Sequence, residues 1–136
     1  MHIIVDAVAI VAALDDRELW HPKAARLFRE LPKPMLTCEA AITESCFLVG
    51  RSSRGLEGLL ALLSSRTIDI DFSLSKELPA VEQLLRKYND VPMSLADACL
   101  VRMSEILDAP VFTFDTDFRI YRRNKQNVIP LIGIDS

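Results

Sequence analysis

Short apolar segments alternate with longer segments of mixed character along this chain. Five short segments predict strands because they are apolar or rich in β-branched and aromatic side chains: residues 2–5, 35–38, 67–72, 111–114 and 128–132. The first predicts a buried strand that ends at Asp6. The third alternates polar and apolar side chains, so we expect one of its faces to be solvated.

Helices are predicted between these strands. Their expected positions are residues 7–14, 22–31, 39–49, 56–63, 79–88 and 94–107, and residues 51–55 break the pattern between the third and the fourth. The second helix begins near Pro22, a favourable residue for a first turn, and should direct Ala25, Leu27 and Phe28 towards the core.

The alternation of strands with helices predicts an α/β fold built around a mainly parallel sheet. We expect a three-layer α/β/α arrangement in which residues 1–136 form a single domain. No repeat, low-complexity tract or linker divides the 136 residues, and this length suffices to bury a core.

Charge restricts the ways in which the chain can meet nucleic acid. A net charge of -3 argues against sequence-independent binding through the whole surface. A local basic patch remains open, and the densest candidate contains Arg119, Arg122, Arg123 and Lys125. A solvated cationic turn explains this segment equally well at this stage.

The cysteines predict neither disulfides nor a zinc site. Cys38, Cys46 and Cys99 are odd in number and form no CxxC pair, so we expect reduced, mostly buried thiols. The two histidines, His2 and His21, do not stand at ligand spacing from a cysteine.

The apolar run at residues 7–14 has the length of a signal-peptide core. However, no basic segment precedes it, and Asp6 and Asp15 bracket it. No stretch is long enough to cross a bilayer. We therefore expect a cytoplasmic protein that does not bind membranes.

Two acidic residues directly follow predicted strands. Asp6 comes after residues 2–5, and Asp115 comes after residues 111–114. In open α/β sheets, ligands bind beyond the carboxyl ends of the strands, where such side chains project. A surface turn is the alternative for each aspartate taken alone.

Two further acidic residues lie on predicted helices beside apolar neighbours. Glu44 shares a helix face with Ala41, Phe47 and Leu48, all expected to point inward, and a buried carboxylate needs a partner or a cation. A buried ion pair or a position at the rim is the alternative. Asp97 also shares an apolar face, but Ser94-Leu95-Ala96-Asp97 fits a capping box, so a purely structural role stays open.

Together the four acidic residues indicate a metal site. Crowded carboxylates cannot all ionise in a dry cleft unless a cation neutralises them, and oxygen ligands suit Mg²⁺ or Mn²⁺. Such ions activate water and stabilise phosphate oxygens in phosphodiester hydrolysis. The sequence therefore favours a metal-dependent nuclease.

The chain resembles the PIN-domain family, and specifically its VapC-type toxins, over nearly its whole length. Four segments carry the resemblance: Ile3-Ile4-Val5-Asp6, Ala41-Ile42-Thr43-Glu44, Met93-Ser94-Leu95-Ala96-Asp97-Ala98 and Phe112-Thr113-Phe114-Asp115-Thr116-Asp117-Phe118. The resemblance implies a ribonuclease toxin of a type II toxin–antitoxin pair. It also implies a homodimer, an RNA substrate and a cognate antitoxin protein.

The resemblance assigns roles to individual residues. The catalytic, metal-binding acids would be Asp6, Glu44, Asp97 and Asp115, with Asp117 as a fifth candidate ligand and Thr113 as a supporting hydroxyl. Sequence position, and not the resemblance, gives a role to the basic residues: they follow Asp115 closely, so we expect Arg119, Arg122, Arg123 and Lys125 to flank the cleft and contact RNA phosphates. His21 resembles a histidine common in the family, and we expect it to be structural.

One departure from the family pattern supports a second hypothesis. The family usually has Thr or Ser after its first aspartate, whereas Ala7 stands there in this chain and is followed by Val8. The alternative function is therefore a catalytically decayed PIN-like module that binds RNA or a partner protein without cleavage. A phosphatase of the haloacid-dehalogenase type is disfavoured, because Arg119 occupies the position where that family needs a hydroxyl.

Overall fold

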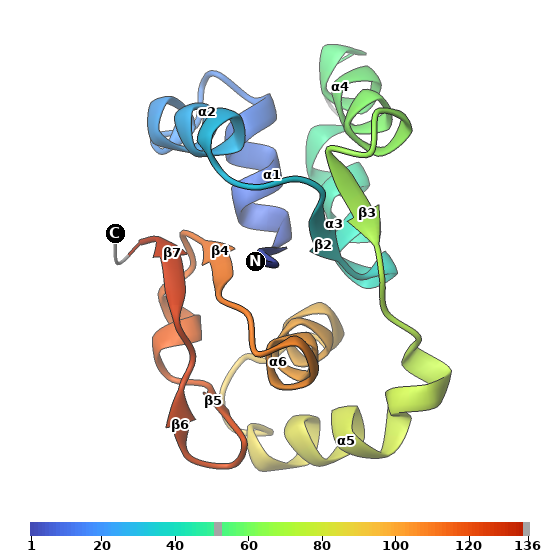
Figure 1. Ribbon diagram of the computed structural model, residues 1–136, viewed down its shortest axis with the longest axis vertical. Coiled ribbons are helices and arrows are strands. Elements are labelled where there is room, and N and C mark those ends of the chain that lie inside the picture. The colour runs from blue at the N-terminus through green and yellow to red at the C-terminus, as the bar shows by residue number, and fades with distance from the viewer. Residues whose placement is uncertain (51–52, 135–136) are drawn as a thin grey trace.

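A five-stranded sheet, parallel at every pairing, forms the centre of the fold (Figure 1). The computed structural model describes residues 1–50 and 53–134. The strand order is β3-β2-β1-β4-β7. These strands are β1 (Ile4–Val5), β2 (Met35–Thr37), β3 (Ile68–Ile70), β4 (Val111–Thr113) and β7 (Leu131–Gly133).

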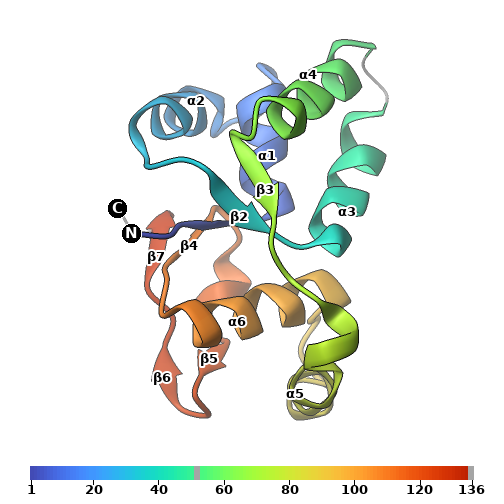
Figure 2. The ribbon, with the colours of Figure 1, turned by 45° about the vertical axis from the view of Figure 1, so that its right-hand side comes forward.

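Helices cover both faces of this sheet (Figures 1 and 2). Their bounds are α1 (Ala7–Leu14), α2 (His21–Glu30), α3 (Glu39–Val49), α4 (Ser53–Ser64), α5 (Leu74–Lys87) and α6 (Leu95–Leu107). Helices α1, α2 and α4 lie on one face and α5 and α6 on the other, while α3 contacts both α1 and α6. A 3-10 helix, η1 (Thr116–Arg119), and a small antiparallel hairpin of β5 (Arg122–Arg123) and β6 (Asn127–Val128) precede β7.

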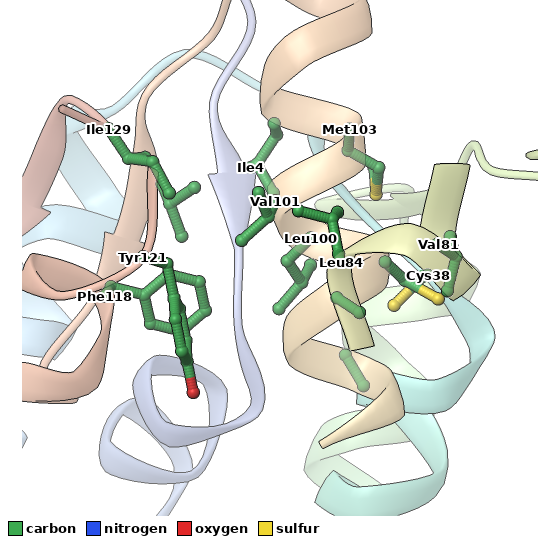
Figure 3. Close-up of a cluster of buried hydrophobic side chains, with 14 of the residues drawn as sticks. Ile4, Cys38, Val81, Leu84, Leu100, Val101, Met103, Phe118, Tyr121 and Ile129 are labelled. Carbon is green, nitrogen blue, oxygen red and sulfur yellow. The ribbon is translucent and has the colours of Figure 1, made fainter. Parts of the chain in front are cut away.

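Two apolar cores separate the three layers. Because side chains alternate along a strand, Ile3 and Val5 face the core beneath α1 and α2, whereas Ile4 faces the core beneath α6. Figure 3 shows the second core, in which Ile4, Leu100 and Tyr121 are fully buried. The predicted three-layer α/β fold with a parallel sheet is therefore confirmed.

Two predicted boundaries were wrong. Residues 128–132 do not form one strand, because Val128 belongs to the hairpin and β7 begins only at Leu131. Pro130 between them cannot donate to a sheet ladder, although its carbonyl oxygen accepts the N–H of Val111 at 2.9 Å. Helix α5 begins at Leu74 rather than near residue 79, because the side chain of Ser73 caps it by accepting the N–H of Lys76.

Several predicted side-chain directions were also wrong. In α3, Ala41 is buried as expected, but Phe47 is 76% exposed and Leu48 is 45% exposed. The inward face of α3 instead contains Ala41, Ser45 and Val49, and small side chains allow it to approach both α1 and α6 closely. In α2, Ala24 rather than Ala25 is the fully buried alanine.

The predicted break at residues 51–55 lies partly outside the described residues, because residues 51 and 52 are not described. For residues 53–55 the prediction was wrong, because they belong to α4. Across the described parts of the chain, no helix combines the length and the apolar character that a membrane span requires.

Candidate active site

Five carboxylates line one open pocket beside the carboxyl ends of β1 and β4. The pocket has a volume of about 220 Å³. Its lining consists of Asp6, Ala7, Val8, Glu44, Pro92, Ser94, Asp97, Leu100, Asp115 and Asp117. The fold thus brings together all four predicted acidic residues and the fifth candidate, from positions far apart in the sequence. We call this cavity the acidic pocket.

Asp6 lies at the bottom of the acidic pocket and is only 3% exposed. It follows β1 and caps α1, where its Oδ1 accepts the N–H of Ala9 at 2.9 Å. Its Oδ2 accepts a short hydrogen bond from the hydroxyl of Thr113. The pKa of Asp6 is raised to about 7. Burial is the largest cause, the hydrogen bonds from Thr113 and Ala9 lower the pKa, and the charges of Asp115 and Asp97 raise it.

Thr113 connects two of the acidic segments. Its hydroxyl oxygen accepts the N–H of Asp115 at 2.9 Å while its hydrogen goes to Asp6. Asp115 then caps η1 by accepting the N–H of Asp117 at 2.9 Å. Partial burial, followed by the charge of Asp115, raises the pKa of Asp117. The predicted supporting hydroxyl is therefore in hydrogen-bond contact with both strand-end acids.

Asp97 forms the predicted capping box and also lines the acidic pocket. The capping box is formed, since Ser94 Oγ accepts the N–H of Asp97 at 3.0 Å and Asp97 Oδ2 accepts the N–H of Ser94 at 3.2 Å. Asp97 also lines the acidic pocket. Burial raises its pKa, and the charge of Asp115 adds to this effect. A helix cap and a place in the site are compatible in this fold.

Glu44 lies at the rim of the acidic pocket and not in the core. Its side chain is exposed, together with those of Phe47 and Leu48, so the expectation of an inward-facing carboxylate was wrong. Partial burial raises the pKa of Glu44, and the charges of Asp97 and Asp115 raise it further. Glu44 belongs to the site because it lines the acidic pocket, although it is exposed.

The chemistry of these donors suits a hard divalent cation. Oxygen ligands predominate at Mg²⁺ and Mn²⁺ sites, and among the described residues no basic side chain lines the acidic pocket. As they stand, however, no three His, Cys, Asp or Glu side chains within residues 1–50 and 53–134 are grouped closely enough to hold one ion. Of the five acids, only Glu44 is exposed, whereas Asp6 is buried and the other three are half-buried.

The sequence matches the profile of the PIN domain over residues 3–124. This chain belongs to the PIN-domain family. Its fold is similar to that of VapC20 from Mycobacterium tuberculosis, described as a toxin that cleaves the sarcin–ricin loop, with a TM-score of 0.76. The two sequences are 23% identical, and the match covers 94% of this chain and 99% of VapC20. A comparison with curated proteins gives no match.

The basic residues of this PIN domain do not line the acidic pocket. Arg123 binds the Ser104 carbonyl oxygen at 3.0 Å and Asp108 at 2.7 Å, at the far end of α6. Ser104 lies about 10 Å along the helix axis from Asp97. The Nη1 group of Arg122 donates to the carbonyl oxygens of residues 119–121. Arg123 therefore does not flank the cleft, contrary to expectation. RNA binding by the basic residues remains a prediction.

Lys125 belongs to a different depression of the PIN domain. It lines a cavity of about 260 Å³ between α5 and α6, together with Lys87, Arg102 and Glu105. A larger cavity of about 350 Å³ lies near the end of α1, and one of its lining residues is His21. Nδ1 of His21 is 2.8 Å from the carbonyl oxygen of Ala12, in agreement with the structural role expected for it.

One residue of the site escaped sequence analysis. The hydroxyl of Tyr121 lies within hydrogen-bond distance of two acceptors, which share its single hydrogen: Oδ2 of Asp97 at 3.1 Å and the carbonyl oxygen of Pro92 at 3.0 Å. Nothing in the sequence connects Tyr121 with Asp97. Tyr121 lies within the basic segment, where the charged residues indicate a function and the tyrosine does not. The only sequence signal is its spacing from Phe118, which places both aromatic rings in the same core.

Proposed function

We propose that this PIN domain is a metal-dependent endoribonuclease and the toxin of a type II toxin–antitoxin pair. One observation supports the proposal above all others: five carboxylates from four separate segments line one open pocket at the carboxyl ends of the central strands. A bound Mg²⁺ or Mn²⁺ ion would activate water and stabilise the phosphate oxygens during phosphodiester hydrolysis.

The residues of the pocket divide into restrained and adjustable acids. Hydrogen bonds from Ala9, Thr113 and the Asp117 N–H hold the carboxylates of Asp6 and Asp115 in place. Asp97 is held through Oδ2. These three acids would hold the ion, whereas Glu44 and Asp117 would complete its ligands and orient the attacking water.

The direct test is to incubate the purified protein with total RNA and Mg²⁺ or Mn²⁺ and to map the ends that appear. A synthetic sarcin–ricin loop is a suitable defined substrate, because VapC20 is described as cleaving it. We expect cleavage that needs the divalent ion and disappears in the Asp115→Asn variant. Cuts that persist with a chelator, or in Asp115→Asn, would contradict the proposal.

A non-cleaving PIN-like module is the second candidate function. Two observations favour it: Ala7 provides no hydroxyl beside Asp6, and the acids within the described ranges are not grouped around one ion. Melting curves separate the two functions, because an ion that binds the folded state raises the melting temperature. RNA binding without such a rise, and without cleavage, would identify the module.

We expect a cognate antitoxin to cover the acidic pocket. A pocket with five carboxylates and no basic lining residue among those described attracts a cation, and an arginine side chain can bind carboxylates through two parallel hydrogen bonds. The test is to co-express the neighbouring gene and to replace the basic residues of its product one at a time. An inhibitor that keeps its activity without any of them would contradict this expectation.

We also expect a homodimer, as the family resemblance implies. The leucine-rich helix α4 offers little apolar surface for it, because Leu59 is fully buried, although Leu56 and Leu60 are exposed. A larger apolar recess, of about 590 Å³, lies between α3 and α6 and includes Phe47 and Leu95. Because Glu44 lines both this recess and the acidic pocket, a second copy docked here would place two acidic pockets near one another.

A cytoplasmic location remains a prediction.

A further inference from the structure

Tyr121 lies at the junction of two acid-bearing segments. Its backbone N–H donates to the carbonyl oxygen of Asp117 at 3.3 Å. Its side-chain hydroxyl reaches the opposite wall of the acidic pocket, where its single hydrogen is shared between Asp97 Oδ2 at 3.1 Å and the Pro92 carbonyl oxygen at 3.0 Å. One residue thus connects the segment after β4 with the start of α6.

The ring of Tyr121 is held rigidly by aromatic neighbours. It makes edge-on contacts with Phe118 and Tyr88, each with ring centroids 5.3 Å apart. Figure 3 shows the Tyr121 ring beside Phe118, with the hydroxyl oxygen at the edge of the apolar cluster. A phenylalanine would fill the same space, so packing alone does not explain the hydroxyl. A buried hydroxyl is retained without penalty only where it finds hydrogen-bond partners.

The hydroxyl of Tyr121 gives Asp97 a hydrogen bond that the capping box does not require. In a capping box, one carboxylate oxygen accepts the backbone N–H of the first residue, and the Ser94 N–H already fulfils this role at Asp97 Oδ2. The bond from Tyr121 is a second one to the same oxygen. With both donors on Oδ2, the carboxylate is fixed in rotation, and Oδ1 is the oxygen left for the acidic pocket.

We propose that Tyr121 is a positioning residue, which holds Asp97 by Oδ2 so that Oδ1 faces the acidic pocket. This inference rests on the proposed function, because its consequence is the affinity for the ion. Tyr121 is not among the residues that line the acidic pocket, so it would act through Asp97. It fixes the direction of one ligand, as the hydrogen-bonding partners of metal ligands commonly do.

The test compares two variants that each lose one hydroxyl from the same aromatic cluster. Tyr121→Phe removes the bond to Asp97, whereas Tyr88→Phe removes only the acceptor of the Arg122 N–H, at 2.8 Å. Calorimetric titration of the metal-free proteins with Mn²⁺ should show affinity about 10–100-fold lower for Tyr121→Phe than for the wild type. Tyr88→Phe should bind Mn²⁺ like the wild type.

A double variant and a crystal structure complete the test. Adding Tyr121→Phe to Asp97→Asn should cause no further loss of affinity, because the two residues act through one interaction. In metal-free Tyr121→Phe, the Asp97 carboxylate should be rotated. Wild-type affinity together with an unrotated Asp97 would overturn the inference and leave the proposed function intact. A wild type that bound no Mn²⁺ would overturn the proposed function, while a rotated Asp97 in the variant would still support the positioning role.

Discussion

The hydroxyl of Thr113 donates a hydrogen bond to Oδ2 of Asp6 and so connects the carboxyl ends of β4 and β1. The same hydroxyl accepts the N–H of Asp115, so both its donor and one of its acceptor positions are used. Ala7, the residue after Asp6, provides no such group. The hydroxyl that supports the first aspartate of this PIN domain therefore comes from a neighbouring strand.

Removal of this hydroxyl should destabilise the protein. Thr113→Val keeps the shape of the side chain but leaves Oδ2 of buried Asp6 and the N–H of Asp115 each without a hydrogen-bond partner. We expect the free energy of unfolding to fall by about 1–3 kcal/mol in urea titrations. Thr113→Ser is the control, because it keeps the hydroxyl and loses one methyl group, worth about 0.8 kcal/mol. Equal losses in the two variants would show that the hydroxyl contributes nothing.

The buried carboxylate of Asp6 should make the metal-free protein more stable in mild acid. Its pKa is raised from 3.8 to about 7, so between these values the folded protein holds a proton that the unfolded chain has released. The free energy of unfolding therefore falls as the pH rises through this window, by at most about 1.4 kcal/mol per pH unit, and this contribution is constant above it. The raised pKa values of Glu44, Asp97 and Asp117 act in the same direction.

Asp6→Asn tests this assignment. The variant cannot ionise at position 6, so urea unfolding at several pH values should show a shallower decline than in the wild type. An identical decline in both proteins would mean that Asp6 is not the group responsible. Saturating Mn²⁺ should reduce the decline in the wild type, because an ion that binds carboxylates competes with protons.

The sequence predicts the sheet and the strand-end acids because local rules determine both. Ile3, Ile4 and Val5 form an apolar run that suits a strand buried on two faces, and Asp6 must then project beyond its end. Parallel strands bring their carboxyl ends to one edge, so Asp6 and Asp115 meet whatever the details of the loops.

The remainder depends on tertiary packing that no local pattern specifies. Phe47 and Leu48 are apolar but exposed, because α3 uses small side chains to pack between two helices. Tyr121 reaches Asp97 only because the segment after η1 turns back against α6. The spacing of residues in the sequence predicts neither the packing of α3 between two helices nor the hydrogen bond between Tyr121 and Asp97.

The exposed recess between α3 and α6 should be a contact between two copies of the chain. Phe47→Lys places a charge in this recess and should convert a dimer into a 15.3 kDa monomer in light-scattering measurements at micromolar concentration. Leu60→Lys, on the exposed side of α4, is the matched control and should remain dimeric. The reverse outcome would assign the interface to α4, and a monomeric wild type would exclude a dimer altogether.

Arg122 and Arg123 should differ in what their removal changes. Arg123 is committed to Ser104 and Asp108, so Arg123→Ala should lower the free energy of unfolding by about 1–3 kcal/mol and leave the salt dependence of RNA binding unchanged. Arg122→Ala should weaken RNA binding and reduce the slope of log affinity against log salt concentration by about 1. Filter binding at several salt concentrations measures this slope, and an unchanged slope for Arg122→Ala would assign both residues to structure.

Asp97 allows the clearest separation of stability from metal binding, because it caps α6 and lines the acidic pocket at once. Asp97→Asn keeps an oxygen that can accept the N–H of Ser94, so the loss of charge near the helix start should cost about 0.3–1 kcal/mol. The variant also no longer buries a charge, and it relieves the repulsion from Asp115; burial and this repulsion both raise the pKa of Asp97, so their removal offsets the loss. The metal-free variant should therefore be about as stable as the wild type. Its rise in melting temperature with Mn²⁺ should nevertheless shrink, and cleavage should fall by orders of magnitude.

Ser73→Ala provides the comparison for Asp97→Asn, because it removes the cap of α5 far from the acidic pocket. It should lower the melting temperature of the metal-free protein, through a loss of about 0.5–2 kcal/mol, and leave the response to Mn²⁺ unchanged. Each variant thus changes only one of the two measurements: Ser73→Ala lowers the melting temperature of the metal-free protein, and Asp97→Asn reduces the response to Mn²⁺. If Asp97→Asn instead behaved like Ser73→Ala, with a lower melting temperature, an unchanged Mn²⁺ response and full cleavage, Asp97 would be a cap alone. The nuclease would then rest on Asp6, Glu44 and Asp115.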